Sequence, residues 1–166
     1  MPIYDITPSQ VTCLCRSKFH YYLFLVILIS KKKILPTDLK LQFHQVKSFD
    51  AVVVDLLNSN LFVLDNEYIS CVSFNVKFPS IKEHPQLENY YKQLDVWDQQ
   101  FPETFKMQNL ITKVYTKKLS FRAIAQIQSV LEKTIAQISS EISADDEMED
   151  EIAHIQIVFN KGNIKL

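Results

Sequence analysis

The segment FHYYLFLVILIS, residues 19–30, constrains the fold more than any other part of this chain, because it contains no Asp, Glu, Lys or Arg. A helix that is apolar on every side has to be buried, either in a protein core or in a membrane. The run covers about 12 residues, whereas a membrane-crossing helix needs roughly 20. Lysines 31–33 follow it without a small-residue cleavage site. We therefore expect a helix buried in protein and no membrane association, with a short signal anchor as the alternative.

The residues on either side of this run show where helices begin and end. Residues 7–10, TPSQ, match a capping box, with threonine as the cap, proline at the first helical position and glutamine returning the bond. Helical spacing then continues to lysines 31–33, whose charges suit a helix C-terminus, so we predict one helix over this range. A short second helix begins at Pro36 and turns Leu39 and Phe43 inward.

Residues 48–60 contain the third predicted helix. Ser48 suits a helix cap, and apolar residues follow at i, i+3, i+4, i+7 and i+8. The β-branched run at residues 51–54 favours a strand instead, but Asp50 and Asp55 stay outside the apolar stripe only if the segment is helical. We therefore predict a helix, whose buried stripe consists of Phe49, Val52, Val53, Leu56 and Leu57.

A turn signal at residues 58–60 separates this helix from two runs with strand character. LFVLD, NEY and ISCVSFNVKF predict a strand, a turn and a second strand. The order helix, short helix, helix and hairpin over residues 19–76 resembles the winged helix-turn-helix superfamily. LISKKKILPTDLKLQF matches its first two helices, and DAVVVDLLNSNLFVLDNEYISCV matches its third helix and wing. The resemblance implies a winged-helix-like N-terminal half with a small antiparallel β wing.

The pattern of the C-terminal half predicts helices. Pro79 and Pro85 bracket a connector, residues 87–101 predict an amphipathic helix that Pro102 ends, and residues 107–115 predict a further helix. We expect a mainly α protein, in which a helical hairpin or bundle follows the winged-helix-like half. Spacing by three and four then predicts the seam of a short coiled coil or bundle edge at Ile124, Ile127, Leu131, Thr134 and Ile138.

Residues 141–151 are strongly acidic, with seven of the nineteen Asp and Glu residues and no Lys or Arg. We interpret them as a solvated linker, with a tail that screens a nucleic-acid-binding body as the alternative. HIQIVFNKGNIKL beyond the linker predicts a terminal hairpin, or a segment that resembles a SUMO-interacting motif, in which Ile155, Ile157 and Val158 add a strand to a partner sheet. The predicted parts are a winged-helix-like domain at 1–78, a helical or coiled-coil-like segment at 86–143, and the linker with its strand segment at 144–166.

The residues that catalysis or cofactor binding needs do not occur at the required spacings. Gly162 is the single glycine, which excludes the Gly-rich phosphate loops of nucleotide-binding enzymes. Cys13 and Cys15 lack the spacer and the second ligand pair of a zinc site, and the histidines stand in no metal motif. We therefore predict no enzyme, no cofactor and no metal site. The three cysteines form an odd set, which favours a reducing compartment, and we expect an intracellular protein in the nucleus rather than the cytoplasm.

The third helix and the wing carry carboxylates where a nucleic-acid reader needs basic residues. Asp50, Asp55, Asp65 and Glu67 fall on the predicted outward surface, and no Lys or Arg occurs between positions 48 and 77. Because carboxylates repel phosphates, we do not expect major-groove reading through this helix. A nucleic-acid-binding factor that makes sequence-independent phosphate contacts is the alternative function, through Lys31, Lys32, Lys33, Lys40, Lys47, Lys113, Lys117, Lys118 and Arg122.

We predict instead a non-enzymatic protein-interaction subunit of a multi-subunit intracellular assembly, as part of a hetero-oligomer. Aromatic residues are favoured interface anchors, and an interrupted apolar seam suits a partner helix. Winged helices joined to coiled coils occur in chromosomal assemblies, which the resemblance implies as one setting. The predicted protein-binding residues are Asp50, Val54, Asp55, Tyr90, Tyr91, Trp97, Ile124, Ile127, Leu131, Ile138, Ile155, Ile157 and Val158.

Overall fold

The computed structural model describes residues 3–44, 46–107 and 120–141, together with Ile155 and Ile157. The chain divides into two compact units, unit 1 (Met1–Lys106) and unit 2 (Met107–Leu166). Among the described residues α-helices predominate, and β2 with β3 forms a small antiparallel sheet. The predicted fold class, mainly α with a small antiparallel sheet, is confirmed.

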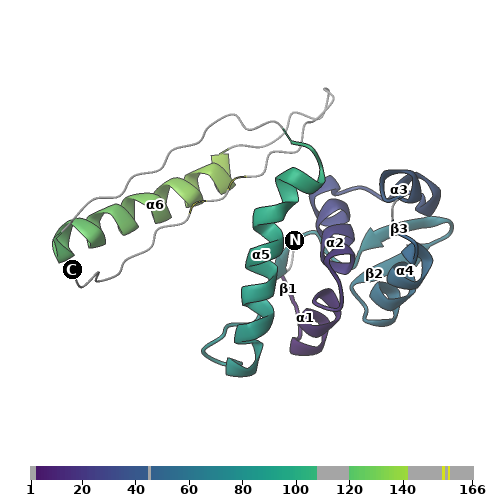
Figure 1. Ribbon diagram of the computed structural model, residues 1–166, viewed down its shortest axis with the longest axis horizontal. Helices are drawn as coiled ribbons and strands as arrows, with labels where there is room; N and C mark the ends of the chain where they lie inside the picture. The colour runs from purple at the N-terminus through teal and green to yellow at the C-terminus, as the bar shows by residue number, and fades with distance from the viewer. Residues whose placement is uncertain (1–2, 45, 108–119, 142–154, 156, 158–166) are drawn as a thin grey trace. The chain divides into compact units, whose positions relative to one another are not determined.

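Unit 1 contains both helices and short strands, which are interspersed along the chain (Figure 1). They are β1 (Tyr4–Asp5), α1 (Pro8–Leu14), α2 (Lys18–Ser30), α3 (Pro36–Gln42), α4 (Phe49–Asn58), β2 (Phe62–Asp65), β3 (Tyr68–Cys71), β4 (Val76–Lys77), the 3₁₀ turn η1 (Pro85–Leu87) and α5 (Glu88–Thr104). Unit 2 contributes α6 (Phe121–Glu141), which contains the predicted seam.

Helix α2 is the core of unit 1, as its apolar sequence predicts. It lies between α5 on one side and the group of α4 and β3 on the other (Figure 1), and α1 also contacts it. Neighbours on several sides explain why α2 is apolar all round. Its buried residues are His20, Tyr21, Tyr22, Leu23, Phe24, Val26 and Ile27.

The prediction of no membrane association can be compared with the length and hydropathy of the helices. Among the described residues no single helix has both the length and the hydropathy that a membrane span requires, although α1 and α2, bent by 109°, meet these criteria as a pair.

The single helix predicted up to the lysine triplet is wrong, because the chain turns at residues 15–17. The predicted capping box is present: Thr7 Oγ1 accepts from the Gln10 N–H, and Gln10 Oε1 accepts from the Thr7 N–H. Gln10 Nε2 donates to the Ser59 carbonyl at 3.0 Å, which holds α1 against the end of α4. Helix α2 leaves the turn at 109° to α1 and enters the core. A single straight helix could not pack against the end of α4 and also enter the core, so the helix breaks.

Helix α4 agrees with the prediction from its apolar stripe. Phe49, Val52, Val53 and Leu56 are buried, and Leu57 is half-buried. The β-branched run therefore lies in a helix, because the helical period is the one that buries its apolar side chains together.

The hairpin after α4 is shorter than the sequence predicts. Its turn contains Asn66 with φ 55°, a left-handed conformation that asparagine adopts more readily than most residues. β3 ends at Cys71, and Val76–Lys77 forms a separate strand that pairs in parallel with β1. On its other side β3 has a second neighbour, since Ile34 forms an antiparallel bridge with Ile69.

The prediction that Pro102 ends its helix is also wrong, since α5 continues to Thr104. A proline in the last turn removes one helical hydrogen bond. The Thr104 hydroxyl donates to the Gln100 carbonyl at 2.9 Å, and the Phe105 N–H donates to the Phe101 carbonyl at 3.1 Å. These bonds close the last turn around the proline.

Helix α5 packs on α2 and belongs to unit 1, which ends at Lys106. The Tyr21 hydroxyl donates to Asp98 Oδ1 at 2.8 Å, and the Tyr22 hydroxyl donates to the Trp97 carbonyl at 2.6 Å. These bonds attach α5 to the core helix. The helix predicted at 107–115 lies outside the described residues apart from Met107, as do the acidic linker beyond Glu141 and, except for Ile155 and Ile157, the terminal hairpin.

Candidate interaction surfaces

The solvent face of α4 carries Asp50, which is exposed and pairs with Lys40, together with three further residues of which two are apolar. Ala51, Val54 and Asn58 are exposed, with 52% of Val54 accessible. Their spacing of three and four residues places them on one side of the helix. Major-groove readers need several hydrogen-bonding side chains on this face, and among these three residues only Asn58 has one.

Asp55, a predicted docking residue, ties α4 to the turn between α1 and α2. Its Oδ2 atom lies 2.8 Å from Arg16 Nη1 and 3.2 Å from His20 Nε2. Hydrogen bonds from Arg16 and then from His20 hold the pKa of Asp55 below its usual value. Sequence reasoning missed this cluster, which we call the Asp55 clamp, because His20 stands 35 positions away.

Ser17 extends the Asp55 clamp, since its hydroxyl lies 2.8 Å from His20 Nδ1. Ser, His and Asp are the residue types of a nucleophilic triad, in which the acid orients the histidine. Here Asp55 also carries the ion pair with Arg16, and Ser17 occupies the N-cap position of α2. A capping serine ordinarily accepts a hydrogen bond from a backbone N–H of the first helical turn, whereas Ser17 makes no such bond and contacts the His20 ring instead. The arrangement therefore joins the start of α2 to α4 through side chains alone.

Asp50 and Asp65 are two of the carboxylates whose charge led us to expect no nucleic-acid reading through α4. They too are paired within unit 1. Lys40 Nζ of α3 lies 2.8 Å from Asp50 Oδ2, and Lys33 Nζ contacts Asp65 Oδ2 at the end of β2. Exposed pairs of this kind stabilise a protein by roughly 0–1 kcal/mol each. Their larger effect is on the surface charge, because both the carboxylates and the two lysines are neutralised.

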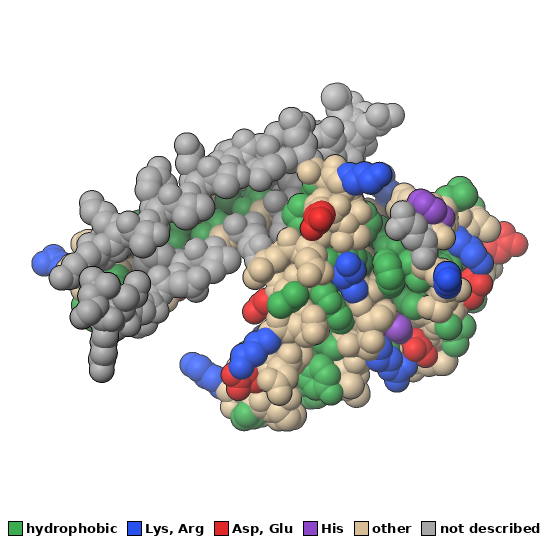
Figure 2. All heavy atoms as spheres, viewed as in Figure 1, with side chains coloured by type: hydrophobic (Ala, Val, Ile, Leu, Met, Phe, Trp, Pro, Cys, Tyr) green, Lys and Arg blue, Asp and Glu red, His purple; other side chains and the backbone are tan. Residues whose placement is uncertain are grey.

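Basic side chains form no single patch on the face of the molecule that Figure 2 shows. There, Lys and Arg (blue) alternate with Asp and Glu (red) over unit 1. Lys31, Lys32 and Lys47 are exposed, and none of them has an ion pair within the described part of the chain. Unit 1 has eleven Lys or Arg and eleven Asp or Glu, so it carries no net charge.

Residues 107–140, which precede the acidic run, carry a basic excess of five Lys or Arg over one Glu. Arg122 is exposed in the first turn of α6. The other predicted phosphate contacts in this stretch, Lys113, Lys117 and Lys118, lie outside the described residues.

The aromatic residues of α5 hold this helix against its own unit. The Trp97 ring lies 6.3 Å from the Tyr21 ring, and the Tyr91 hydroxyl donates to the Pro79 carbonyl at 2.7 Å. Tyr90, Tyr91 and Trp97 are all half-buried. Contacts within the chain account for the positions of Tyr91 and Trp97, so these rings do not require a partner protein.

Helix α6 carries the predicted seam, and none of its side chains from residue 121 to residue 138 is fully buried. Phe121 and Val130 are 82% and 61% exposed. The charged residues Arg122, Glu132 and Lys133 fall outside the apolar stripe at about 100° per residue. The half-buried members of the seam are Ile124, Ile127, Leu131 and Ile138.

The two described residues of the C-terminal segment are exposed. Ile155 is 60% accessible and Ile157 is 41% accessible, as a segment that adds a strand to a partner requires before binding. Val158, the third predicted residue of this motif, lies outside the described residues.

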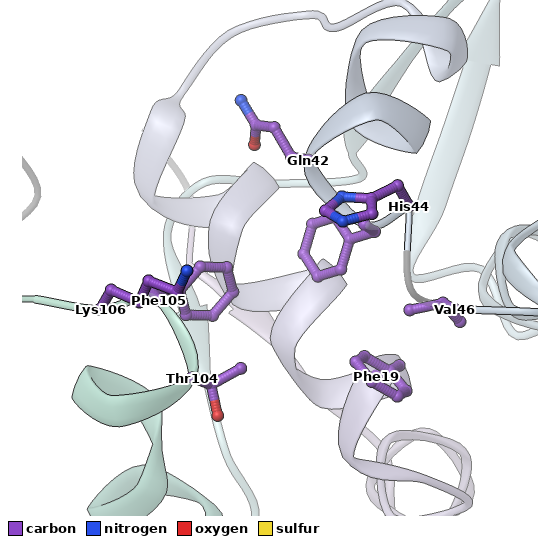
Figure 3. Close-up of a pocket in the computed structure, with 8 residues that line it drawn as sticks. Phe19, Gln42, His44, Val46, Thr104, Phe105 and Lys106 are labelled. Atoms are coloured by element: carbon purple, nitrogen blue, oxygen red, sulfur yellow. The ribbon is translucent and has the colours of Figure 1, made fainter.

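A hollow of about 250 Å³ in unit 1 lies where the start of α2, the end of α3 and the end of α5 meet (Figure 3). Pockets for drug-sized ligands have roughly 300–1,000 Å³. The volume of this hollow is therefore slightly below that range. Among the residues that line it are Phe19, Phe43, His44, Val46, Phe105 and Lys106.

Comparison with known proteins adds no functional assignment. No protein-family model matches the chain, and the searches of curated proteins and of solved structures find no match. Within the described ranges, no group of three or more His, Cys, Asp or Glu side chains is arranged to hold a metal ion.

Proposed function

We propose that this chain is a non-enzymatic subunit that docks other proteins, with α6 as its principal docking helix. The observation that carries the proposal is the apolar stripe of α6, a helix of 21 residues without a fully buried side chain at positions 121–138. A helix in the interior of a domain buries such a stripe. Partner proteins recognise helices through apolar anchors three and four residues apart, which is the spacing of the seam.

The stripe offers enough apolar surface for a modest interface. Fully burying an Ile or Leu side chain contributes about 1.5–3 kcal/mol. Four seam residues of α6 are already half-buried, so burying the rest contributes about 1 kcal/mol each and about 4 kcal/mol together, before the costs of association. This magnitude suits a docking helix that acts together with a second contact, as in a multi-subunit assembly.

We further propose that unit 1 is a winged helix whose third helix meets protein rather than nucleic acid. The order α2, α3, α4, β2 and β3, with the bridge between Ile34 and Ile69, supports the winged-helix interpretation. The carboxylates of Asp50 and Asp55 are held in ion pairs, and Val54 is exposed between them. Such a face suits an apolar protein surface. By analogy with other winged helices joined to helical segments, we propose a nuclear, chromosome-associated assembly as its setting.

The basic excess of residues 107–140 favours a second candidate function, sequence-independent phosphate binding. Fluorescence anisotropy of a labelled DNA duplex, measured over a series of salt concentrations, tests it. Micromolar binding with a steep salt dependence, abolished by Lys113, Lys117 and Lys118→Glu, would establish the second candidate and overturn a protein-only function.

Quantitative affinity purification from the native source tests the docking proposal. The wild type is compared with the double variant Ile127→Glu, Leu131→Glu, which places two carboxylates in the stripe, and with the control Gln126→Glu, Ser129→Glu, which places two on the polar side of α6. We expect partners that the control retains and the stripe variant loses. If every recovered protein is equally abundant in all three samples, α6 is not the docking helix.

A further inference from the structure

The apolar residues in the stripe of α6 are placed symmetrically about Leu131. Ile127 stands four positions before Leu131 and Ile135 four positions after it, while Ile124 and Ile138 stand seven positions away on either side. The two uncharged polar residues also correspond, with Gln128 three positions before and Thr134 three positions after. At about 100° per residue the whole set falls within an arc of roughly 120°. It consists of Ile124, Ile127, Gln128, Leu131, Thr134, Ile135 and Ile138.

From this symmetry we propose that α6 pairs with α6 of a second copy of this chain in antiparallel orientation, with Leu131 on the two-fold axis. The inference rests on the proposed docking function of α6 and names its partner. A two-fold interface brings the same patch of both copies together. In an antiparallel pair about Leu131, Ile124 faces Ile138 and Ile127 faces Ile135 of the other copy. Gln128 then faces Thr134, so that an amide and a hydroxyl can share a hydrogen bond.

The charges of α6 permit this pairing. Arg122, Glu132 and Lys133 fall outside the arc that would meet the other copy, so no like charges meet within the contact. Antiparallel helices also align the positive end of one dipole with the negative end of the other. The helix has 21 residues and is therefore about 31 Å long, which allows all seven positions to meet in one straight contact.

Sedimentation velocity of the full chain over about 1–200 µM tests the pairing. We expect a reversible dimer of micromolar affinity. Leu131→Glu should weaken it at least about 100-fold, because two carboxylates would meet at the axis in an apolar contact. Ser129→Glu, on the polar side of the helix, should leave the dimer unchanged. A monomer over the whole range, or a dimer that Leu131→Glu leaves intact, overturns the proposal.

Charge complementation decides the orientation and removes the effect of misfolding. Ile124→Glu and Ile138→Lys should each be monomeric alone and should dimerise when mixed, because positions 124 and 138 meet only in the antiparallel pair. Ile124→Glu mixed with Ile124→Lys should stay monomeric. If the second mixture dimerises and the first does not, the pair is parallel and the proposal is wrong.

The two proposals fail in different experiments. If the purified chain is a monomer but native partners still depend on the stripe, the docking function stands and the second copy is excluded as its partner. If differently tagged copies of this chain are the only proteins lost from the stripe variant, the second copy is the partner of α6, and the docking of other proteins through this helix is refuted.

Discussion

A Gln10→Leu substitution would remove a buried amide that joins three parts of unit 1. Gln10 is 4% exposed. Its Nε2 atom donates to the Tyr4 hydroxyl at 2.9 Å and to the Ser59 carbonyl at 3.0 Å, and its Oε1 atom accepts from the Thr7 N–H at 2.8 Å. Leucine has a similar size and helix propensity, so the substitution isolates the hydrogen bonds from packing.

The expected cost follows from those three bonds. A hydrogen bond of this kind contributes about 1 kcal/mol net, and more where the partner is left unsatisfied. Ser59 is half-buried and Thr7 is exposed, so water can reach some of the freed groups and the lower value applies. Burying leucine in place of the amide returns about 1 kcal/mol. We therefore expect Gln10→Leu to lower the free energy of unfolding by about 2 kcal/mol.

Urea unfolding followed by tryptophan fluorescence measures this loss. Trp97 is the single tryptophan of the chain and lies 6.3 Å from Tyr21, so its emission reports on unit 1. A loss of about 2 kcal/mol lowers the urea midpoint by about 1 M. The control is Gln93→Leu, an exposed glutamine of α5 whose replacement should change stability by less than about 0.5 kcal/mol. Equal midpoints for the two variants would refute the reasoning.

The Asp55 clamp leads to a prediction about pH. The folded pKa of Asp55 is lowered, so its contribution is present at neutral pH and is lost as the pH falls through that folded value. Asp55→Asn should therefore lower the urea midpoint at pH 7 but not well below about pH 4, and a difference that persists in acid would argue against the ion pair. Burial raises the pKa of the Cys15 thiol to about 11 and that of Cys71 to about 12. Both should react with iodoacetamide at pH 8 at least about 100-fold more slowly in the folded protein than in urea, as intact mass will show, and equal rates would contradict their burial. Lys31 has φ 51° at the end of α2, which costs a residue with a Cβ atom about 1 kcal/mol. Lys31→Gly should raise the midpoint detected through Trp97, whereas a lower midpoint would show that the lysine charge at the helix end matters more.

The parts of the candidate sites that could be predicted are those that depend on helical period. The stripe of α6 and the outward position of Val54 follow from spacing by three and four, which the sequence displays directly. The partners of Asp50 and Asp55 could not be predicted. Lys40 and Arg16 reach them only because α3 and the turn after α1 fold against α4. The sequence of α4 therefore suggests an acidic surface, whereas its two carboxylates are paired with basic side chains and the surface is close to neutral.

By itself, the sequence determined the local elements of this protein. The capping box at Thr7, the buried helix at residues 19–30, the hairpin turn at Asn66 and the stripe of α6 all depend on residues within about four positions of one another. Only the tertiary structure decided the turn at residues 15–17, the attachment of α5 to α2 and the Asp55 clamp. These features depend on contacts between residues 35 to 77 positions apart, and such contacts form only when whole elements pack together.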